Sequence, residues 1–312
     1  MRSGELTDQT VVITGGAGFI GSHLATALDS ASGVRILDDL TTGQRENIPD
    51  EAILFEGDLR DEDTLVQATD EIDIIFHEAA LVSVQQSIET PLTSHEINVD
   101  GTLSLLEVAR KQDARIVLAS SAAIYGHPIH VPITEVHSKN PTSPYGLDKL
   151  TIDHYARLYH DLYDLETIAL RYFNVYGPGQ VAGDYSGVIS VFIDQALSGE
   201  DITVHGDGDQ TRDFVFIDDV VQANRKAATT DAVGEVYNIG TGESITIREL
   251  AELIQDITDT NSDIVHTEAR TGDIDHSEAD ISKAKEHLDY EPSVSIREGL
   301  EQTIEWYRIH KE

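Results

Sequence analysis

Short apolar segments alternate with longer amphipathic ones through the first half of the chain. The β-branched run Val11–Ile13 ends at a glycine-rich segment and predicts a buried strand. Similar runs predict strands over 34–37, 52–55, 72–76, 115–119 and 166–172. Helical spacing of apolar positions is found over 18–28, 91–111 and 145–163. Strands that alternate with helices predict an α/β fold, a doubly wound parallel sheet covered on both faces.

The pattern becomes less regular after Asn174. Gly177–Gly179 and Ala182–Tyr185 have the composition of loops, and a helix is predicted over 188–197. Further strands are predicted over 202–205, 214–217 and 236–239. We found no internal repeat and no flexible linker. We therefore expect a large domain over 1–174, to which about 211–242 returns, and a smaller mixed α/β lobe formed mainly by 175–312.

The charge of the chain is strongly acidic. Asp and Glu total 57 against 21 Lys and Arg, a formal net charge of −36, and the acids are spread along the chain. We interpret them as a solvated surface, which repels nucleic acid and anionic membranes, so neither is an expected partner. Lysine is scarce. Because high salt screens self-repulsion, this pattern predicts a halophilic source.

Several classes of protein are excluded by composition. The chain has no cysteine, so it has no disulfide, thiolate metal site or cysteine nucleophile, and we expect no metal. Residues 1–10 are polar and lack the apolar segment of a signal peptide. No stretch approaches 18 apolar residues, so no membrane span is expected. We expect a cytoplasmic protein.

The segment after the first strand carries a dinucleotide-binding fingerprint. Gly15 would allow the tight turn, Gly18 would let the backbone approach a pyrophosphate, and Gly21 would let the helix pack closely on the sheet. The preceding strand, the following helix and an acid downstream all agree with this interpretation. That acid, Asp38, ends the second strand, where a carboxylate binds the adenosine ribose and repels a 2′-phosphate. NAD is therefore favoured over NADP. Asp39 could share this role, and the alternative is that either acid only caps the loop.

Two further strand ends belong to the same predicted crevice. Asp58 ends the third strand and is expected beside the adenine. His77-Glu78-Ala79-Ala80 ends the fourth, where the small residues leave room for the dinucleotide. We interpret His77 as a packing residue, because a single histidine without a partner motif carries little information.

Tyr145 and Lys149 form a pair that predicts proton transfer. Four residues apart on a helix, their side chains share one face. Tyrosine is a poor base at neutral pH, but a nearby ammonium favours the phenolate, which accepts a proton from a sugar hydroxyl. Ser121 ends the fifth strand and could donate to the same oxygen. The alternative for Ser121 is a serine that only satisfies backbone groups.

Together these motifs resemble the extended short-chain dehydrogenase/reductase family, and within it the UDP-glucose 4-epimerases. The resemblance covers nearly the whole chain. It is carried by the segments 14–24, 37–43, 57–61, 77–80, 120–126, 145–149, 171–178, 211–220 and 237–242. It implies a Rossmann domain with a substrate-binding lobe, bound NAD, a nucleotide-sugar substrate and a homodimer formed through two helices of each subunit.

The resemblance also implies the roles of individual residues. Ser121, Tyr145 and Lys149 are implied to be catalytic. The implied cofactor-binding residues are Gly15, Gly18, Phe19, Ile20, Gly21, Asp38, Asp39, Asp58, Leu59, Ala79, Ala80, Asn98, Tyr145, Lys149 and Phe173. The implied substrate-binding residues are Ser121, Tyr145, Asn174, Val188, His205, Arg212, Arg270 and Asp273. Arginine suits a diphosphate because its planar fork matches phosphate oxygens, and the alternative for both arginines is a surface salt bridge.

The resemblance implies C4 epimerisation of a UDP-glucose type sugar through a transient 4-keto intermediate. Related 4,6-dehydratases and decarboxylases place an acid within two residues of the catalytic Ser or Thr, whereas this chain has Ala122 and Ala123, which cannot transfer a proton. The alternatives are a nucleotide-sugar dehydrogenase or reductase, a dehydratase-like enzyme, and a non-catalytic NAD-binding regulator. The intact set of Ser121, Tyr145 and Lys149 argues against the regulator.

Two segments depart from the pattern of the relatives. Gly187–Ser190, expected to line the nucleotide pocket, lacks the asparagine or proline that many relatives have. Ser277 stands where the family gates the sugar pocket by side-chain size, and its small side chain suggests room for an N-acetylated sugar. The sequence leaves open which nucleotide and sugar are bound.

Overall fold

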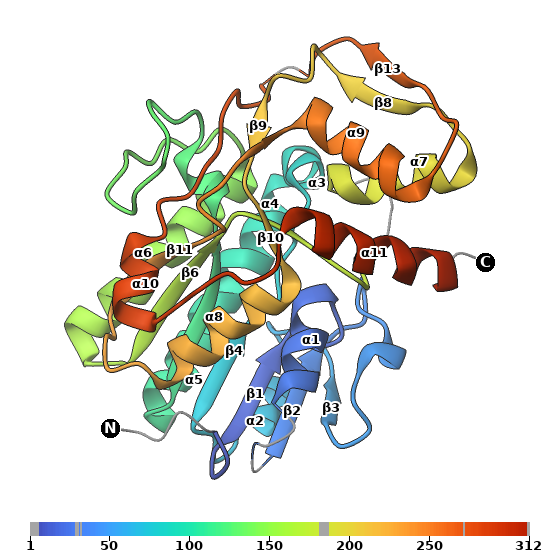
Figure 1. Ribbon diagram of the computed structural model, residues 1–312. Coiled ribbons are helices and arrows are strands. Elements are labelled where there is room, and N and C mark those ends of the chain that lie inside the picture. The colour runs from blue at the N-terminus through green and yellow to red at the C-terminus, as the bar shows by residue number, and fades with distance from the viewer. Residues whose placement is uncertain (1–5, 29–30, 32, 181–186, 271, 311–312) are drawn as a thin grey trace.

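The computed structural model describes residues 6–28, 31, 33–180, 187–270 and 272–310. Its centre is a seven-stranded sheet in the order β11-β6-β5-β4-β1-β2-β3, in which every neighbouring pair is parallel (Figure 1). The strands are β1 (Thr10–Thr14), β2 (Gly33–Asp38), β3 (Ile53–Glu56), β4 (Ile74–His77), β5 (Arg115–Ser121), β6 (Thr167–Tyr172) and β11 (Glu235–Ile239). The predicted doubly wound parallel sheet is confirmed. The strand order reverses between β1 and β4, and ligands of such sheets bind in the crevice at that point.

Helices cover both faces of the sheet. One face carries α1 (Phe19–Ala27), α8 (Ile217–Thr229) and α10 (Ser282–Leu288), and the other carries α2 (Glu62–Ala68), α5 (Gly101–Gln112) and α6 (Pro144–Tyr163). Neighbouring residues of β1 pack into different cores. Val11 and Ile13 pack with the helices of the α1 face, and Val12 packs with the helices of the α2 face. This is why the strand is apolar throughout rather than alternating.

The predicted helix over 91–111 is a continuous helical stretch with a wider turn in its middle. It consists of α4 (Pro91–His95), the π-helical turn η2 (Glu96–Asp100) and α5. The buried Asn98 lies in the π-turn, and its side chain hydrogen-bonds both backbone groups of Leu81. Such turns are frequent at functional sites. Here the turn ties the helix to the loop that follows β4.

The C-terminal lobe packs beyond the carboxyl ends of the strands (Figure 1). Its core is formed by α7 (Val188–Ser198), α9 (Ile247–Thr258) and α11 (Ile296–His310). Three two-stranded sheets complete it: β7 (Asn174–Tyr176) with β10 (Phe214–Phe216), β8 (Ile202–His205) with β13 (Ile264–Thr267), and β9 (Thr211–Arg212) with β12 (Ile245–Thr246). The shorter helices of the chain are η1 (Arg45–Asn47), α3 (Val84–Glu89) and η3 (Ala122–Tyr125).

Two details of the sequence prediction need comment. Ile217 was expected to end a strand, but it is the first residue of α8, where its side chain is buried against the lobe. An apolar residue at a strand-to-helix junction satisfies either pattern. The predicted loop Ala182–Tyr185 lies outside the described residues. Within the described part of the chain, no helix is both long and apolar enough to cross a membrane.

Candidate active site

The loop between β1 and α1 contacts the loop that follows β4. Gly15 has a φ of 70°, which favours glycine, and a Cβ there would lie 2.6 Å from the backbone nitrogen of Ala79. A Cβ on Gly21 would collide with the carbonyl oxygen of Gly15. Gly21 was expected to let the helix pack closely on the sheet. In the structure, the closest atoms to Gly21 belong to the glycine loop, at Gly15 and Gly16. The two loops at the switch point are thus packed backbone to backbone.

The start of α1 is suited to a diphosphate. Its N-cap, Gly18, supplies no side-chain hydrogen bond, and its first turn contains no acid. By contrast, side chains of Asp61, Ser83 and Ser143 cap α2, α3 and α6. The first amides of α1, at Phe19 and Ile20, therefore remain as donors for an anion at the positive end of the helix dipole. These residues fit a dinucleotide.

Asp38 is buried at the end of β2 beside the glycine loop. Its Oδ2 accepts from the backbone nitrogen of Ala17 at 2.9 Å and its Oδ1 from that of Leu40 at 2.9 Å. Asp39 is exposed and accepts from the Thr41 nitrogen at 2.9 Å. Loop capping is thus present at both acids. At Asp38 the same bonds also fix a carboxylate where the ribose of a dinucleotide is expected.

Asp58 has a partner that the sequence analysis missed. Arg60 donates to its two carboxylate oxygens at 2.8 and 2.6 Å, and this holds the pKa of Asp58 below its usual value. Leu59 between them is buried. The predicted adenine neighbour is therefore half of an ion pair, whose planar guanidinium also offers a stacking surface.

The structure brings Ser121, Tyr145 and Lys149 together at the carboxyl end of β5. Tyr145 and Lys149 lie on the first turns of α6, and the Lys149 Nζ is 5.9 Å from the centre of the Tyr145 ring. Ser121 hydrogen-bonds the Tyr145 side chain, which lowers the pKa of that phenol, and it also accepts from the Ala123 nitrogen at 3.2 Å. The three predicted catalytic side chains thus share one crevice.

Burial sets the protonation of this group. The pKa of Tyr145 is raised by burial and lowered by its hydrogen bond with Ser121. Burial lowers the pKa of Lys149 to about 8, and its Nζ donates to the Ala119 carbonyl at 2.8 Å. Without further positive charge nearby, the tyrosine stays protonated at neutral pH. The positive ring of oxidised NAD would favour its ionisation.

A buried ion pair joins β6 to the helix that carries Tyr145 and Lys149. Arg171 of β6 donates to both carboxylate oxygens of Asp153 on α6 at 2.8 and 2.9 Å, and Ser120 donates to the same carboxylate at 3.2 Å. Arg171 also donates to the Tyr125 hydroxyl at 2.9 Å. Sequence patterns gave no sign of this network, because its partners come from three separate segments.

His77 is held between two threonines. Its Nδ1 lies 2.7 Å from Thr14 Oγ1 and its Nε2 lies 2.7 Å from Thr102 Oγ1. Burial lowers the pKa of His77 to about 3, so the ring is neutral. This geometry agrees with its interpretation as a packing residue. Phe173, predicted for the cofactor pocket, is also buried.

The predicted substrate residues lie on the lobe and its junction with the sheet. Arg212 forms an ion pair with Asp273, and Asn174 donates to the Asp213 carbonyl at 2.9 Å. The other predicted residues are Val188, the first residue of α7, His205, which bonds Thr267, and Arg270, whose side chain is exposed. Arg212 and Asp273 are therefore brought together. Arg270 lies next to this pair, because its carbonyl accepts a hydrogen bond from the Asp273 nitrogen at 3.3 Å; the clamp of Arg212 and Arg270 on a diphosphate stays a prediction.

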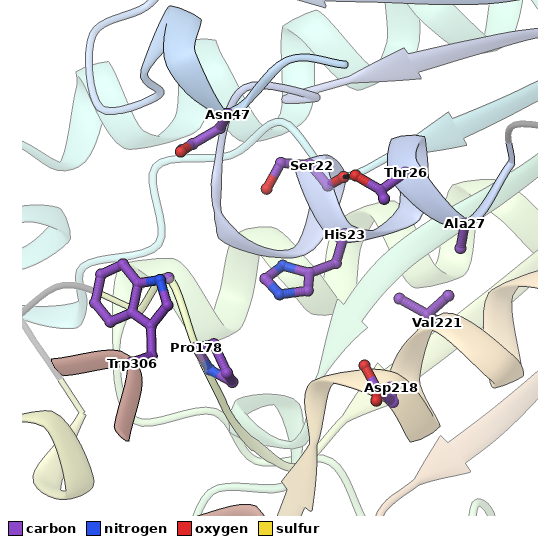
Figure 2. A pocket seen from close by; sticks show the side chains of 10 residues that line it. Ser22, His23, Thr26, Ala27, Asn47, Pro178, Asp218, Val221 and Trp306 are labelled. Carbon is purple, nitrogen blue, oxygen red and sulfur yellow. Dashed lines mark hydrogen bonds between the residues drawn. The ribbon is translucent and has the colours of Figure 1, made fainter. Parts of the chain in front are cut away.

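A separate cleft of about 540 Å³ lies on the outer flank of α1 (Figure 2). Its lining includes His23 of α1, Asp218 of α8 and Trp306 of α11. Ser121, Tyr145 and Lys149 are not among its lining residues. This cleft is therefore distinct from the crevice that holds the predicted chemistry.

Comparison with known proteins agrees with this geometry. Residues 11–240 match the model of the NAD dependent epimerase/dehydratase family. A crystal structure of UDP-glucose 4-epimerase from Thermotoga maritima, with UDP-glucose, superposes with a TM-score of 0.94 at 38% identity and covers 97% of this chain and 100% of that one.

Curated relatives differ in their reactions. UDP-glucose 4-epimerase of Mycolicibacterium smegmatis is 36% identical over 95% of this chain and 98% of its own length. UDP-N-acetyl-alpha-D-glucosaminuronate decarboxylase of Bacillus cytotoxicus is 34% identical over 95% of this chain and 97% of its own length. Similarity therefore supports a nucleotide-sugar substrate and leaves the reaction to be argued from the residues.

Proposed function

The chain belongs to the NAD dependent epimerase/dehydratase family, and from that premise we propose that it catalyses C4 epimerisation of a nucleotide sugar. The observation that carries the proposal is the convergence of Ser121, Tyr145 and Lys149, with alanine at 122 and 123 after Ser121. An enzyme that removes water or carbon dioxide needs a further acid or base near the sugar. Alanine at these two positions cannot supply one.

The proposed roles of the residues follow from their positions. Tyr145 takes the proton of the C4 hydroxyl, and Ser121 donates a hydrogen bond to the oxygen that becomes the ketone. Lys149 supplies the positive charge that favours the phenolate. When bound, NAD would supply reversible hydride transfer at C4, so that the oxidation of the sugar needs no other oxidant. The 4-keto sugar turns over in the crevice, and Tyr145 protonates the C4 oxygen again.

We propose which residues hold each part of the cofactor. The amides at the start of α1 would bind the pyrophosphate, and Asp38 the adenosine ribose. Asp58 with Arg60 would flank the adenine. Because NAD is regenerated in each cycle, it should remain bound after purification. We propose that 1–174 with about 211–242 forms the NAD-binding domain, and the remainder mainly the substrate lobe.

For the substrate, we propose that Arg212 contacts the diphosphate after its ion pair with Asp273 opens or reorients. Arg270 is exposed, its carbonyl accepts from the Asp273 nitrogen at 3.3 Å, and its side chain would join Arg212 at the diphosphate. Asn174, Val188, His205 and Asp273 are the remaining proposed contacts. The buried Ser277 is proposed to leave room for an N-acetyl group.

The decisive experiment is incubation with a panel of UDP- and dTDP-linked hexoses, N-acetylhexosamines and glucuronic acid. Configuration at C4 is then measured by NMR. Interconversion of gluco and galacto forms without net change of NAD would support the proposal. Release of carbon dioxide or water, or accumulation of free NADH, would contradict it and support the decarboxylase, dehydratase or dehydrogenase alternatives.

We also propose a homodimer. Several large apolar side chains are exposed on α3, α4 and α6, among them Ile88, Leu92, Leu147 and Leu162 with 55, 80, 55 and 61% of their surface accessible. These helices contact one another within the subunit, and we propose that their exposed apolar side chains are covered by a second copy of the chain. Light scattering of the purified protein at high salt should give twice the mass of one chain. Replacement of Leu92 and Leu162 by lysine should yield monomers.

A further inference from the structure

The end of β4 carries an acid that the mechanism above does not use. Glu78 follows directly after His77, and its Oε1 accepts a hydrogen bond from the Tyr172 hydroxyl at 2.8 Å. That hydroxyl in turn accepts from the Asn224 amide nitrogen at 2.8 Å. The chain of bonds connects β4, β6 and α8. It fixes the carboxyl group of Glu78 beside the catalytic crevice.

Lys149 is a buried cation that needs a counter-charge. Only 3% of its surface is accessible, and its Nζ donates to the Ala119 carbonyl. Within the described parts of the chain, no carboxylate lies within 4 Å of this nitrogen. An ammonium in such a place is costly unless negative charge compensates it. His77 of β4 is paired with Leu118 of β5, so the next residues, Glu78 and Ala119, follow at the same edge of the sheet, and the carbonyl of Ala119 binds the Lys149 Nζ. In agreement with this placement, Glu78 is the largest electrostatic contribution that raises the pKa of Lys149, ahead of Asp148.

Asp148 is less suited to this role because its oxygens are already engaged. Ser94 Oγ donates to one at 2.7 Å, and His95 Nδ1 lies 2.9 Å from the other. Glu78 accepts a hydrogen bond from the neutral hydroxyl of Tyr172. Among the described residues, no cation is in direct contact with its carboxyl group. When Glu78 is ionised, Lys149 is therefore the one cation in the described part of the chain that contributes to stabilising its charge.

The groups that face Glu78 come from each element packed around it. From α6 these are Lys149 and Tyr145, from β6 Tyr172, and from its own strand the neutral His77; the nearest α8 side chain, Asn224, is uncharged. Burial raises the pKa of Glu78 to about 7, although the residue is not completely shielded from solvent. The acid also raises the pKa of Tyr145. Its negative charge thus favours the ammonium of Lys149 and opposes the phenolate of Tyr145.

We propose that Glu78 is a positioning residue of the active site, the counter-charge that keeps Lys149 as an ammonium at working pH. Its effect on turnover rests on the proposed function, whereas its effect on Lys149 does not. Replacing Glu78 by glutamine keeps an oxygen for Tyr172 and removes the charge. Lys149 should then lose its proton at lower pH, and Tyr145 should ionise at lower pH because a like charge is gone.

A direct test measures the titration of Lys149 in the NAD-loaded protein. The chain has few lysines, so carbon-13 labelling at Cε gives a simple NMR spectrum, and Lys149→Met identifies the signal. In Glu78→Gln the midpoint should fall by about one pH unit. In Glu62→Gln, which removes an exposed acid on α2, it should not move. A midpoint for Glu78→Gln within about 0.3 units of the parent would overturn the proposal.

A second variant keeps the proposal testable if Glu78→Gln fails to fold. Tyr172→Phe removes only the hydroxyl that donates to Glu78, and this raises the pKa of the acid. Glu78 is then partly neutral near pH 8, so the midpoint of Lys149 should move in the same direction by a smaller amount. A midpoint that rises or stays unchanged would contradict the proposal.

Turnover supplies the third readout. If the enzyme epimerises its substrate, both limbs of the pH profile of kcat should move to lower pH in Glu78→Gln. A merely structural role would reduce the plateau and leave both limbs in place, and that result counts against the proposal. If no sugar is turned over but Lys149 still responds to Glu78, the proposed function fails and this inference stands.

Discussion

At the scale of single residues, the site depends on charges held where water has little access. Lys149 and Glu78 are of opposite charge, and burial moves the pKa of the first down to about 8 and of the second up to about 7. Burial and the charge of Glu78 raise the pKa of Tyr145, and its hydrogen bond with Ser121 lowers that pKa. Conservative substitutions at any of these side chains should therefore change the ionisation of the site more than its geometry.

Removing the Tyr145 hydroxyl tests the proposed chemistry most directly. Tyr145→Phe should reduce kcat by about 10³-fold, because a positioned base contributes on that order. NAD should remain bound, since the proposed contacts to its pyrophosphate and adenosine ribose come from the start of α1 and Asp38 and do not involve the phenol. Stopped assays and the NAD content of the purified variant provide the measurements.

The matched control is Tyr163→Phe, at the exposed end of the same helix. It should keep parental kcat. Near-parental activity of Tyr145→Phe would refute the mechanism, and loss of NAD from that variant would show that the change acts through the fold.

His77 should make stability fall in acid. Its pKa is about 3 in the folded chain against an ordinary value of 6.5, so the unfolded chain binds a proton first. Its contribution is complete above pH 6.5 and is lost as the pH falls towards 3, on the order of 5 kcal/mol. His77→Gln should flatten urea-derived stability over this range.

Glu78 changes the free energy of unfolding with pH in the direction opposite to His77. Its raised pKa means that stability is lost as the pH rises from 4.5 to about 7. Because both groups contribute to the pH dependence, the stability of His77→Gln is compared with that of the parent at each pH. The exposed His127→Gln should keep the parental slope. If His77→Gln and the parent have parallel curves, the neutral buried histidine is refuted.

At the scale of elements, the first turn of α6 positions the chemistry. Ser143 caps this helix by accepting from the Gly146 nitrogen, Pro144 occupies its first position, and Tyr145 comes next. The Tyr145 nitrogen donates to Ser87 of α3 at 3.1 Å. The reacting group is therefore fixed by a helix end rather than by a loop.

Removing this cap should cost both stability and turnover. Ser143→Ala should lower the free energy of unfolding by about 1 kcal/mol and lower kcat several-fold, because the first turn frays where Tyr145 lies. Thr246→Ala removes the equivalent cap of α9 in the lobe. It should cost similar stability with unchanged kcat. Equal kcat in the two variants would contradict the coupling of this cap to catalysis.

At the scale of the whole molecule, net charge governs the response to salt. A charge of −36 on 312 residues produces strong self-repulsion in dilute buffer. The salt bridges among the described residues do not compensate this repulsion, because most are exposed and each contributes little. The proposed halophilic origin follows from this balance.

The melting temperature should rise with KCl, by about 10 °C between roughly 0.1 and 3 M, as the Debye length falls from about 10 Å to a few Å. Scanning calorimetry at several salt concentrations gives the measurement. Sucrose at matched osmolality separates screening from solvent exclusion. Full stability and activity at low salt would refute the halophilic proposal.

The sequence alone determined the parts of the protein that depend on near neighbours. The glycine loop, Asp38 at the next strand end and the helical spacing of Tyr145 and Lys149 are local patterns, each with a fixed geometric meaning. Apolar runs separated by helices determined the parallel sheet in the same way.

Only the tertiary structure decided which buried charges meet. Tyr172 reaches Glu78 across 94 residues of sequence, and Arg171 pairs with Asp153 from another element. Likewise, Arg212 forms an ion pair with Asp273, a partner 61 residues away that the sequence analysis did not assign to it. The cost of a buried charge depends on the particular groups around it, and these come from distant segments that no local pattern can identify.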